Sequence, residues 1–201
     1  MTTIYSVVNQ PNDQFGYSCY ALVIPASEAV TAQVEQLRNT VGVTVASIPA
    51  HITVKGTFFS IESLDQVRQA VREIAGAAAP FFIPFDGAEV HWWSDVAALA
   101  VPVPPPLQAL HDTLVARITP MGLPAYRDDP YVAHMTLVYN PSPDRVELAR
   151  KLLSEMNLGA GFQAEAVHLM GRVGPRYGGA WHRIERFPLS AAEKASRSEQ
   201  P

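Results

Sequence analysis

The chain has 201 residues, of which 48% are hydrophobic and 17% are charged, and its formal net charge at pH 7 is −4. This length and composition fit one globular domain and exclude a disordered or fibrous protein. The negative charge argues against broad electrostatic binding to long duplex nucleic acid, although a single pocket can still be locally basic.

The single cysteine, Cys19, excludes an internal disulfide and every metal cluster built from several cysteines. Such sparse cysteine usage favours a reducing compartment, so we expect a cytoplasmic protein. The N-terminal stretch has no basic segment followed by a long apolar run, and no run of about 18 apolar residues occurs anywhere. We therefore expect neither a signal peptide nor a membrane span, and we favour a monomer.

Secondary-structure signals follow one order in the first half of the chain. An apolar run closed by proline precedes a helical stripe that ends at Gly42, and the alternating stretch "HITVKGTFF" comes next. Ser63 and Gln66 have the spacing of a capping box. The predicted elements are strands at 17–25, 51–59 and within 81–93, with one helix before Gly42 and another after Ser63.

The second half retraces this order. Three consecutive prolines from Pro104 suit a helix start, and Ser142 with Pro143 resembles an N-cap and first turn. The predicted elements are strands at 95–103, 134–140, 162–171 and 181–189, with helices after residues 104 and 143.

This repeated order predicts an α+β, bilobal duplicated fold, with two small antiparallel-type sheets, helices on their outer faces and a central cleft. We expect one domain over residues 1–189, with lobe-forming halves at about 17–93 and 95–189. The small and polar residues 190–201 predict a disordered tail. A pseudo-twofold axis would bring the strands at 51–59 and 134–140 together across the cleft.

These two strands carry the same pattern of a histidine and a threonine two residues apart. Side chains alternate faces along a strand, so His51 and Thr53 share one face and His134 and Thr136 share another. Each strand therefore has an apolar back for helices and a polar front for chemistry.

One H-x-[ST] match alone is weak, because about 0.7 matches are expected by chance among six histidines. A third match, at His111 and Thr113, lies in a helical pattern, where residues two apart point in different directions. We interpret His111 as a half-buried packing residue. The two strand matches differ from it because they occupy equivalent places in the two halves.

With "HITV" at 51–54 and "HMTL" at 134–137, the chain resembles the two-histidine (2H) phosphoesterase superfamily, which includes 2′-5′ RNA ligase-like and cyclic phosphodiesterase proteins. The continuation Lys55-Gly56 also resembles many members, and the element order agrees over roughly residues 17–189. The resemblance implies cleavage, or the reverse joining, of 2′,3′-cyclic phosphates or 2′-5′ linkages without a metal or other cofactor. The substrate would be a small cyclic nucleotide or an RNA terminus.

The chemistry of these residues agrees with that implication. Two imidazoles flanking one phosphorus can supply a general base for water and a general acid for the leaving sugar oxygen near neutral pH. Thr53 and Thr136 can donate hydrogen bonds to the phosphate oxygens. The resemblance implies that cyclic phosphates open to 2′-phosphates, which would make His51 the candidate acid and His134 the candidate base.

Further candidates for substrate binding lie beside the motifs. Lys55 shares the predicted face of His51. The glycine-rich stretch 171–181 holds Arg172, Tyr177 and Trp181, which suit a flap that meets phosphate and base, or an ordinary hairpin loop.

The stretch "YRDDPY" carries Tyr126 and Tyr131, which can line the cleft, although Asp128-Asp129-Pro130 also suits a simple turn. We interpret His168 as a packing residue on its strand. Likewise, we assign His91, Trp92 and Trp93 to a hinge or the core.

Two other functions remain open. A metal-dependent phosphodiesterase would combine the histidines with Asp128 and Asp129, although ligand-type spacings such as H-x-H are absent from the sequence. A nucleotide- or RNA-end-binding module would keep the site without turnover. Sensitivity to a chelator separates the first from metal-free catalysis, and recovery of unchanged substrate would reveal the second.

Overall fold

A computed structural model describes residues 11–43, 48–93, 95–125, 130–175 and 179–191 of the chain. The strands in these residues are β1 (Cys19–Pro25), β2 (His51–Phe59), β3 (Phe81–Pro84), β4 (Glu89–Trp93), β5 (Val96–Ala100), β6 (Leu123–Pro124), β7 (His134–Tyr139), β8 (Gly161–Ala164), β9 (Ala166–Val173) and β10 (Ala180–Pro188). The α-helices are α1 (Glu28–Val41), α2 (Leu64–Ala77), α3 (Pro105–Ile118) and α4 (Val146–Glu155), and short 3-10 turns occupy η1 (Thr119–Met121) and η2 (Pro143–Arg145).

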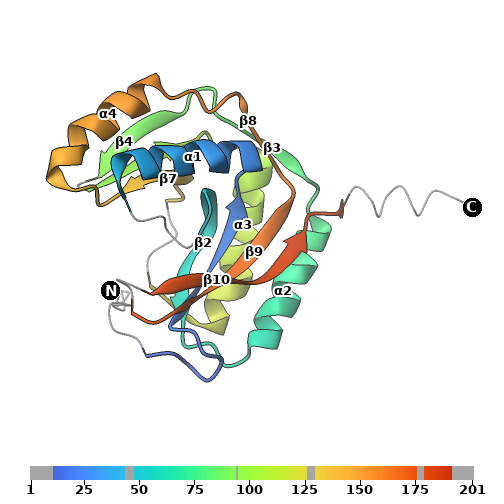
Figure 1. Cartoon of the computed structure of the whole chain (residues 1–201). Coiled ribbons are helices and arrows are strands. Elements are labelled where there is room, and N and C mark those ends of the chain that lie inside the picture. Colours follow the sequence, from blue (N-terminus) through green and yellow to red (C-terminus); the bar gives the residue numbers. More distant parts are fainter. Residues whose placement is uncertain (1–10, 44–47, 94, 126–129, 176–178, 192–201) are drawn as a thin grey trace, which may run out of the picture.

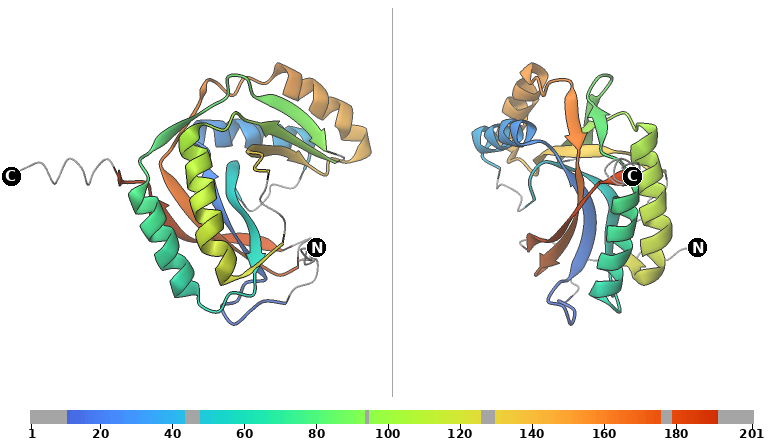
Figure 2. Two further views of the ribbon diagram at one scale, coloured as in Figure 1. Left: turned by 180° about the vertical axis from the view of Figure 1, so that it is seen from behind. Right: turned by 90° about the vertical axis from the view of Figure 1, so that its right-hand side faces the viewer.

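The strands form three antiparallel sheets, as Figure 1 shows. The largest has the order β10-β9-β1-β2-β6, a second has the order β4-β5-β7, and β3 pairs with β8. Helices α2 and α3 cover one face of the five-stranded sheet, while α1 and α4 lie with the three-stranded sheet (Figures 1 and 2). The predicted α+β class with antiparallel sheets is confirmed, and the central cleft stays a prediction.

Each sheet takes strands from both halves of the sequence. Strands β1 and β2 pair with β9 and β10, whereas β4 pairs with β5. The expectation that 17–93 and 95–189 each form a lobe is therefore wrong. The repeated order of elements is real, but β-pairing between the halves interleaves them.

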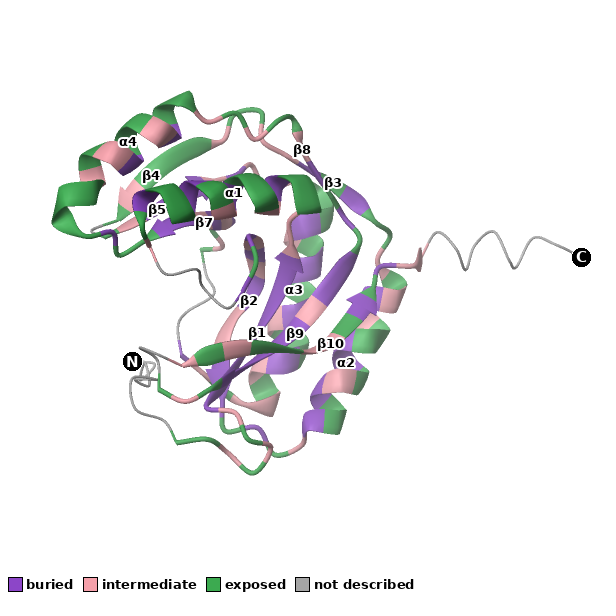
Figure 3. Ribbon diagram, viewed as in Figure 1, coloured by how far each residue is buried: buried purple, intermediate pink, exposed green. Residues whose placement is uncertain are grey.

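The helices are interleaved in the same way, and this arrangement positions the motif strands. Helix α3 contacts β2, and helix α1 contacts β7, so each motif strand rests on the helix from the other half of the chain. The motif strands β2 and β7 also contact one another. The apolar backs of the strands are buried against the helices, while the outer helix surfaces are exposed (Figure 3).

Several local predictions are confirmed by the caps. Ser63 Oγ accepts the N–H of Gln66 at 3.3 Å at the start of α2. Gly42 ends α1 in the left-handed region with φ 75°, a conformation that glycine adopts without strain. Ser142 precedes the 3-10 turn η2 instead of capping α4 directly, and its side chain makes no cap hydrogen bond.

Two predicted strands are each divided in the structure. The stretch 81–93 forms β3 and β4, and the stretch 162–171 forms β8 and the first part of β9. In both cases the chain passes from the small β3-β8 sheet into a larger sheet, so each predicted strand contributes to two sheets. Among the described residues, no helix is long and apolar enough to cross a membrane.

Candidate active site

The two motif histidines are held in the same way, although they lie on different sheets. His51 Nδ1 lies 2.8 Å from Pro49 O, and His134 Nδ1 lies 3.0 Å from Val132 O. A carbonyl oxygen can only accept, so Nδ1 carries the proton in both rings. The Nε2 atom of each imidazole is therefore the one that can take up or release a proton.

The motif threonines lie on the same faces as their histidines. Thr53 pairs with Val23 of β1 while His51 pairs with Pro25, and Thr136 pairs with Ala98 of β5. Both threonines are half-buried, and neither hydroxyl has a hydrogen-bond partner in the described part of the chain. Both hydroxyls are thus available to donate to an anion.

A β-bulge follows each motif threonine. The register of β2 against β1 skips Val54, and the register of β7 against β5 skips Leu137. A bulge adds one residue to a strand, increases the local twist and re-aims the neighbouring side chains. The two motifs therefore share their local backbone geometry as well as their residues.

The carbonyl groups at the first bulge are held by an aromatic pair. Tyr131 Oη donates to Thr53 O at 3.0 Å, and His111 Nδ1 of α3 donates to Val54 O at 2.8 Å. The two rings stack with centroids 3.8 Å apart and planes 10° apart. His111 is buried as a packing residue should be, but it also fixes the motif strand, a role that sequence reasoning missed.

The second bulge is held by a buried cation. Arg38 of α1 donates through Nε to Leu137 O at 3.0 Å and through Nη2 to Thr136 O at 2.7 Å. The residue is only 5% exposed. Its sequence context, the last turn of a helix, is typical of a surface residue, so nothing in the pattern marks this contact.

Charge and burial act together on His51. Burial, the largest cause, lowers the pKa of His51 to about 4, and the hydrogen bond to Pro49 O acts in the opposite direction. The charges of Arg38 and His134 lower this pKa further. The neutral imidazole is therefore favoured at His51 in the free protein.

An exposed aromatic residue stands beside His134. Trp93 of β4 makes an edge contact with the imidazole, with ring centroids 5.2 Å apart, and His91 stacks parallel to Trp93 at 6.2 Å. Trp93 is 43% exposed, so its assignment to the core is wrong. On the other face of the strand, the guanidinium of Arg150 lies over Trp92, 4.5 Å from the ring centroid.

The alternation predicts Lys55 on the face of His51, and this placement is wrong. Because the bulge at Val54 adds a residue, Lys55 lies opposite Leu22, whose side chain belongs to the core behind the sheet. Lys55 is fully buried, and its Nζ donates to Gly56 O at 3.3 Å. This placement does not support direct contact with substrate.

Arg172 and Trp181 do lie on the face of the five-stranded sheet that carries Thr53. They pair with each other across β9 and β10, and the guanidinium lies 5.6 Å from the centroid of the indole. Arg172 is buried and donates to Ser18 Oγ at 3.3 Å. Trp181 packs over the apolar cluster around Cys19.

The other predicted binding residues are placed differently. Tyr131 directs its hydroxyl to the backbone of Thr53, as described above, which makes it a positioning residue. Tyr126 and Tyr177 lie outside the described residues, as do Asp128 and Asp129. In the described ranges, no three His, Cys, Asp or Glu side chains gather as a potential metal site.

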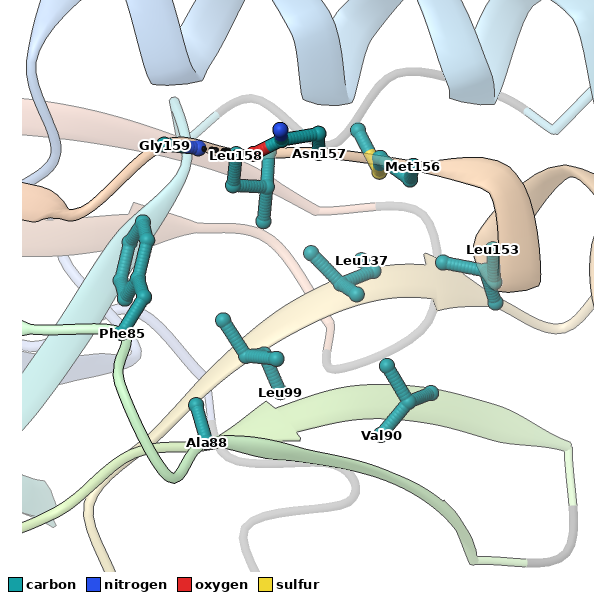
Figure 4. A pocket seen from close by; sticks show the side chains of 10 residues that line it. All are labelled: Phe85, Ala88, Val90, Leu99, Leu137, Leu153, Met156, Asn157, Leu158 and Gly159. Carbon is teal, nitrogen blue, oxygen red and sulfur yellow. Dashed lines mark hydrogen bonds between the residues drawn. The ribbon is translucent and has the colours of Figure 1, made fainter.

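A pocket of about 270 Å³ lies away from this chemistry (Figure 4). Leu137, Leu99 and Val90 line it from the three-stranded sheet, and Leu153 and Met156 line it from the α4 side. Leu99 pairs with Met135, on the opposite face of the sheet from Thr136. The pocket is lined mainly by apolar residues and is partly open, and the motif residues are outside it.

Comparison with known structures supports the fold. The chain is similar to the LigT protein of Escherichia coli solved with NADP+, with a TM-score of 0.57 and 17% identity over 85% of this chain and 97% of that chain. It is also similar to a Thermus thermophilus protein, with a TM-score of 0.62 and 16% identity over 85% of this chain and 97% of that one. A structure described as a phosphoesterase gives a TM-score of 0.60 at 17% identity, covering 86% and 98% of the two chains.

No curated protein matches the sequence significantly. The family model described as the 2′-5′ RNA ligase superfamily, however, matches residues 25–176, which include both motif strands and the bulges that follow them. The match covers more than half of the chain. The chain therefore belongs to the 2′-5′ RNA ligase superfamily of two-histidine phosphoesterases.

Proposed function

We propose that the protein is a metal-independent phosphoesterase that hydrolyses, or reversibly joins, 2′,3′-cyclic phosphate or 2′-5′ phosphodiester bonds of RNA ends or small nucleotides. One observation carries the proposal: two H-x-T strands are in contact, and each has Nδ1 of its histidine bonded to a carbonyl and, on the same face, a threonine hydroxyl with no partner among the described residues. Two imidazoles with fixed tautomers and two hydroxyl donors are what acid–base attack on a phosphorus requires.

In the proposed hydrolysis, a water oxygen attacks the phosphorus of the cyclic phosphate. The neutral motif imidazole accepts the water proton on Nε2, and the protonated one donates its Nε2 proton to the departing ribose oxygen. The P–O bond of the ring breaks, the product is a phosphomonoester, and the two imidazoles exchange protonation states. Thr53 and Thr136 donate to the non-bridging oxygens, on which negative charge increases in the transition state.

The electrostatics of His51 constrain the assignment of roles. The family resemblance makes His51 the acid, which must be protonated when the substrate binds. Burial and Arg38 lower the pKa of His51 and oppose that protonation in the free protein. If His51 is the acid, the anionic substrate must raise this pKa when it binds, because a nearby negative charge favours the imidazolium.

The test is hydrolysis of a 2′,3′-cyclic nucleotide in EDTA between pH 5 and 9, with His51→Ala and His134→Ala beside the wild type. His182→Ala serves as the matched control, since it removes an exposed histidine of β10 that lies outside both motif strands. Activity that survives EDTA, follows a bell-shaped pH profile and disappears only in the two motif variants supports the proposal. Loss in EDTA would indicate a metal enzyme, and binding without turnover would indicate a recognition module.

The solved relatives make nucleotides a reasonable first substrate class. The Escherichia coli LigT protein has been crystallised with NADP+, 3′-AMP and ATP. The exposed ring of Trp93 beside His134 gives this chain a surface on which a base can stack. We propose that Trp93 contacts the base of the substrate while the two motifs hold its phosphate.

A further inference from the structure

Three basic side chains gather on the helix-free face of the five-stranded sheet. Val23 of β1 lies opposite both Thr53 of β2 and His168 of β9, and His168 lies opposite Arg186 of β10. Directly opposed residues of antiparallel strands share a face. Thr53, Val23, His168 and Arg186 therefore form one row across four strands, and Arg183, opposite Met170, lies in the next row.

The order of strands in this row sets how far His168 and Arg186 lie from Thr53. Neighbouring strands are about 4.8 Å apart, so the backbone of His168 is roughly 10 Å from that of Thr53 and the backbone of Arg186 is roughly 14 Å away. A phosphate held at Thr53 is too far away to contact His168 and Arg186 as well. A second anionic group of the same substrate, further along its length, can reach them by passing over Val23, which is buried in a cluster with Ile48.

The positive charge of this row and the next comes from Arg183 and Arg186. Arg183 and Arg186 are exposed, and neither forms an ion pair with a carboxylate in the described ranges. Glu185, between them, points to the opposite face of β10, where Arg68 and Arg72 of α2 bind it at 3.3 and 2.7 Å. Within the described residues, β10 thus has a carboxylate paired with arginines on its helix side and two guanidinium groups without an ion-pair partner on the side of the motif.

His168 is affected by both arginines. Burial, the largest cause, and the charges of Arg183 and Arg186 lower the pKa of His168 to about 4, so its imidazole is neutral and can donate one hydrogen bond at neutral pH. The interpretation of His168 as a packing residue is therefore incomplete: it is half-buried among cations. On a chain with a net charge of −4, these two exposed arginines beside a half-buried imidazole make this part of the sheet locally basic.

We propose that His168, Arg183 and Arg186 form a binding subsite for a second phosphate of the substrate, in the row that leads away from Thr53. The preferred substrate then carries two phosphates: the cyclic one at the motifs and another further along, as in the phosphodiester of an RNA end or the 5′-phosphate of a nucleotide. This inference rests on the proposed function and specifies its substrate.

The kinetic test compares three substrates: a 2′,3′-cyclic mononucleotide with a 5′-hydroxyl, the same molecule with a 5′-phosphate, and a dinucleotide that ends in a cyclic phosphate. In the double variant Arg183→Gln/Arg186→Gln, we expect kcat/KM to fall about 10- to 100-fold for whichever substrate places a phosphate in the subsite, mainly through KM. The 5′-hydroxyl mononucleotide should change less than about threefold, because it leaves the subsite empty. The substrate that loses most identifies the source of the second phosphate.

Arg72→Gln is the matched control, because Arg72 interacts with the same strand from its other face. An equal loss on all three substrates, or no loss on any, would overturn the subsite while leaving the proposed function in place.

A binding measurement keeps the subsite testable without turnover. By calorimetry, adenosine 2′,5′-bisphosphate should bind the wild type more tightly than adenosine 2′-phosphate, and the double variant should lose that advantage. Failure of wild-type turnover on all three substrates would contradict the proposed function alone. Equal affinities in the wild type, or an advantage that persists in the variant, would contradict the subsite.

Discussion

The two motif strands present the same chemistry from unlike surroundings. On β2 and on β7, the histidine donates Nδ1–H to the carbonyl two residues earlier, and a bulge follows the threonine. Behind β2, however, the bulge rests on the stacked rings of His111 and Tyr131, whereas behind β7 it rests on the guanidinium of Arg38. The two halves share the backbone geometry of the motif, but different side chains support it in each half.

The difference matters for the electrostatics of the site. On the β2 side, burial raises the pKa of Tyr131, so its hydroxyl is uncharged at neutral pH. The support of β7 is a buried cation, and it acts on His51, the histidine of the other strand. Arg38 therefore supports the strand of His134 and also lowers the pKa of His51 on the other motif strand.

Among the residues around the two motif histidines, the largest effects should come from Thr53 and Thr136, because both motif strands are expected to use their threonine in the same way. Thr53→Val and Thr136→Val each remove one hydroxyl donor to the phosphate, and each should lower kcat by about 10²-fold. The melting temperature should barely change, because neither hydroxyl bonds to a described residue of the protein. If steady-state kinetics show one variant unchanged, the threonine of that motif strand does not hold the phosphate.

Arg38→Met should produce the next largest effect. It removes the charged support of β7, which has no charged equivalent behind β2 among the described residues. The substitution leaves the carbonyls of Thr136 and Leu137 without their donors, which should lower the free energy of unfolding by about 2 kcal/mol. Removal of the cation also favours the imidazolium, so the pKa of His51 should rise, as followed by NMR titration. The control is Arg117→Met, in the last turn of the equivalent helix α3. An unchanged pKa of His51 would refute the coupling.

Tyr131→Phe tests the aromatic support with a smaller change. The ring still stacks on His111, and only the hydrogen bond to Thr53 O is lost. We expect the free energy of unfolding to fall by about 1 kcal/mol, less than for Arg38→Met. Denaturant unfolding of both variants measures the difference. A larger loss in Tyr131→Phe would reverse our ranking of the two supports.

His168→Gln should have the smallest effect, visible only in the pH dependence of stability. The folded pKa of His168 is lowered to about 4 from a usual value near 6.5, so the unfolded chain binds more protons between these values. Wild-type stability should therefore decrease as the pH falls from about 6.5 to 4, and the variant should lose part of this decrease. Identical slopes in the two proteins over this window would show that His168 is not perturbed.

Sequence reasoning found the residues whose pattern is local. His51 with Thr53 and His134 with Thr136 stand two apart on strands, and a period of two is visible in any strand with an apolar back. The caps at Ser63 and Gly42 are local for the same reason.

It failed wherever long-range pairing decides the outcome. Lys55 leaves the face of His51 because of a bulge that appears only when β1 pairs with β2. Arg38 and Leu137 are far apart in sequence and meet only because α1 packs on the strand of the other half. Trp93 reads as core in the apolar run at 81–93, but it lies on the exposed face beside His134. The interleaving of the two halves follows from the same cause.

The central claim is that both motif histidines act on one phosphorus, and a double-variant measurement tests it most directly. Single-turnover hydrolysis of a 2′,3′-cyclic nucleotide in EDTA would compare His51→Ala, His134→Ala and the variant that carries both changes. We predict that each single change lowers the rate by about 10²–10⁴-fold. The double variant should lose little more than the worse single one, because the two groups act as a unit. Near wild-type activity in either single variant, or losses that multiply in the double variant, would contradict this account.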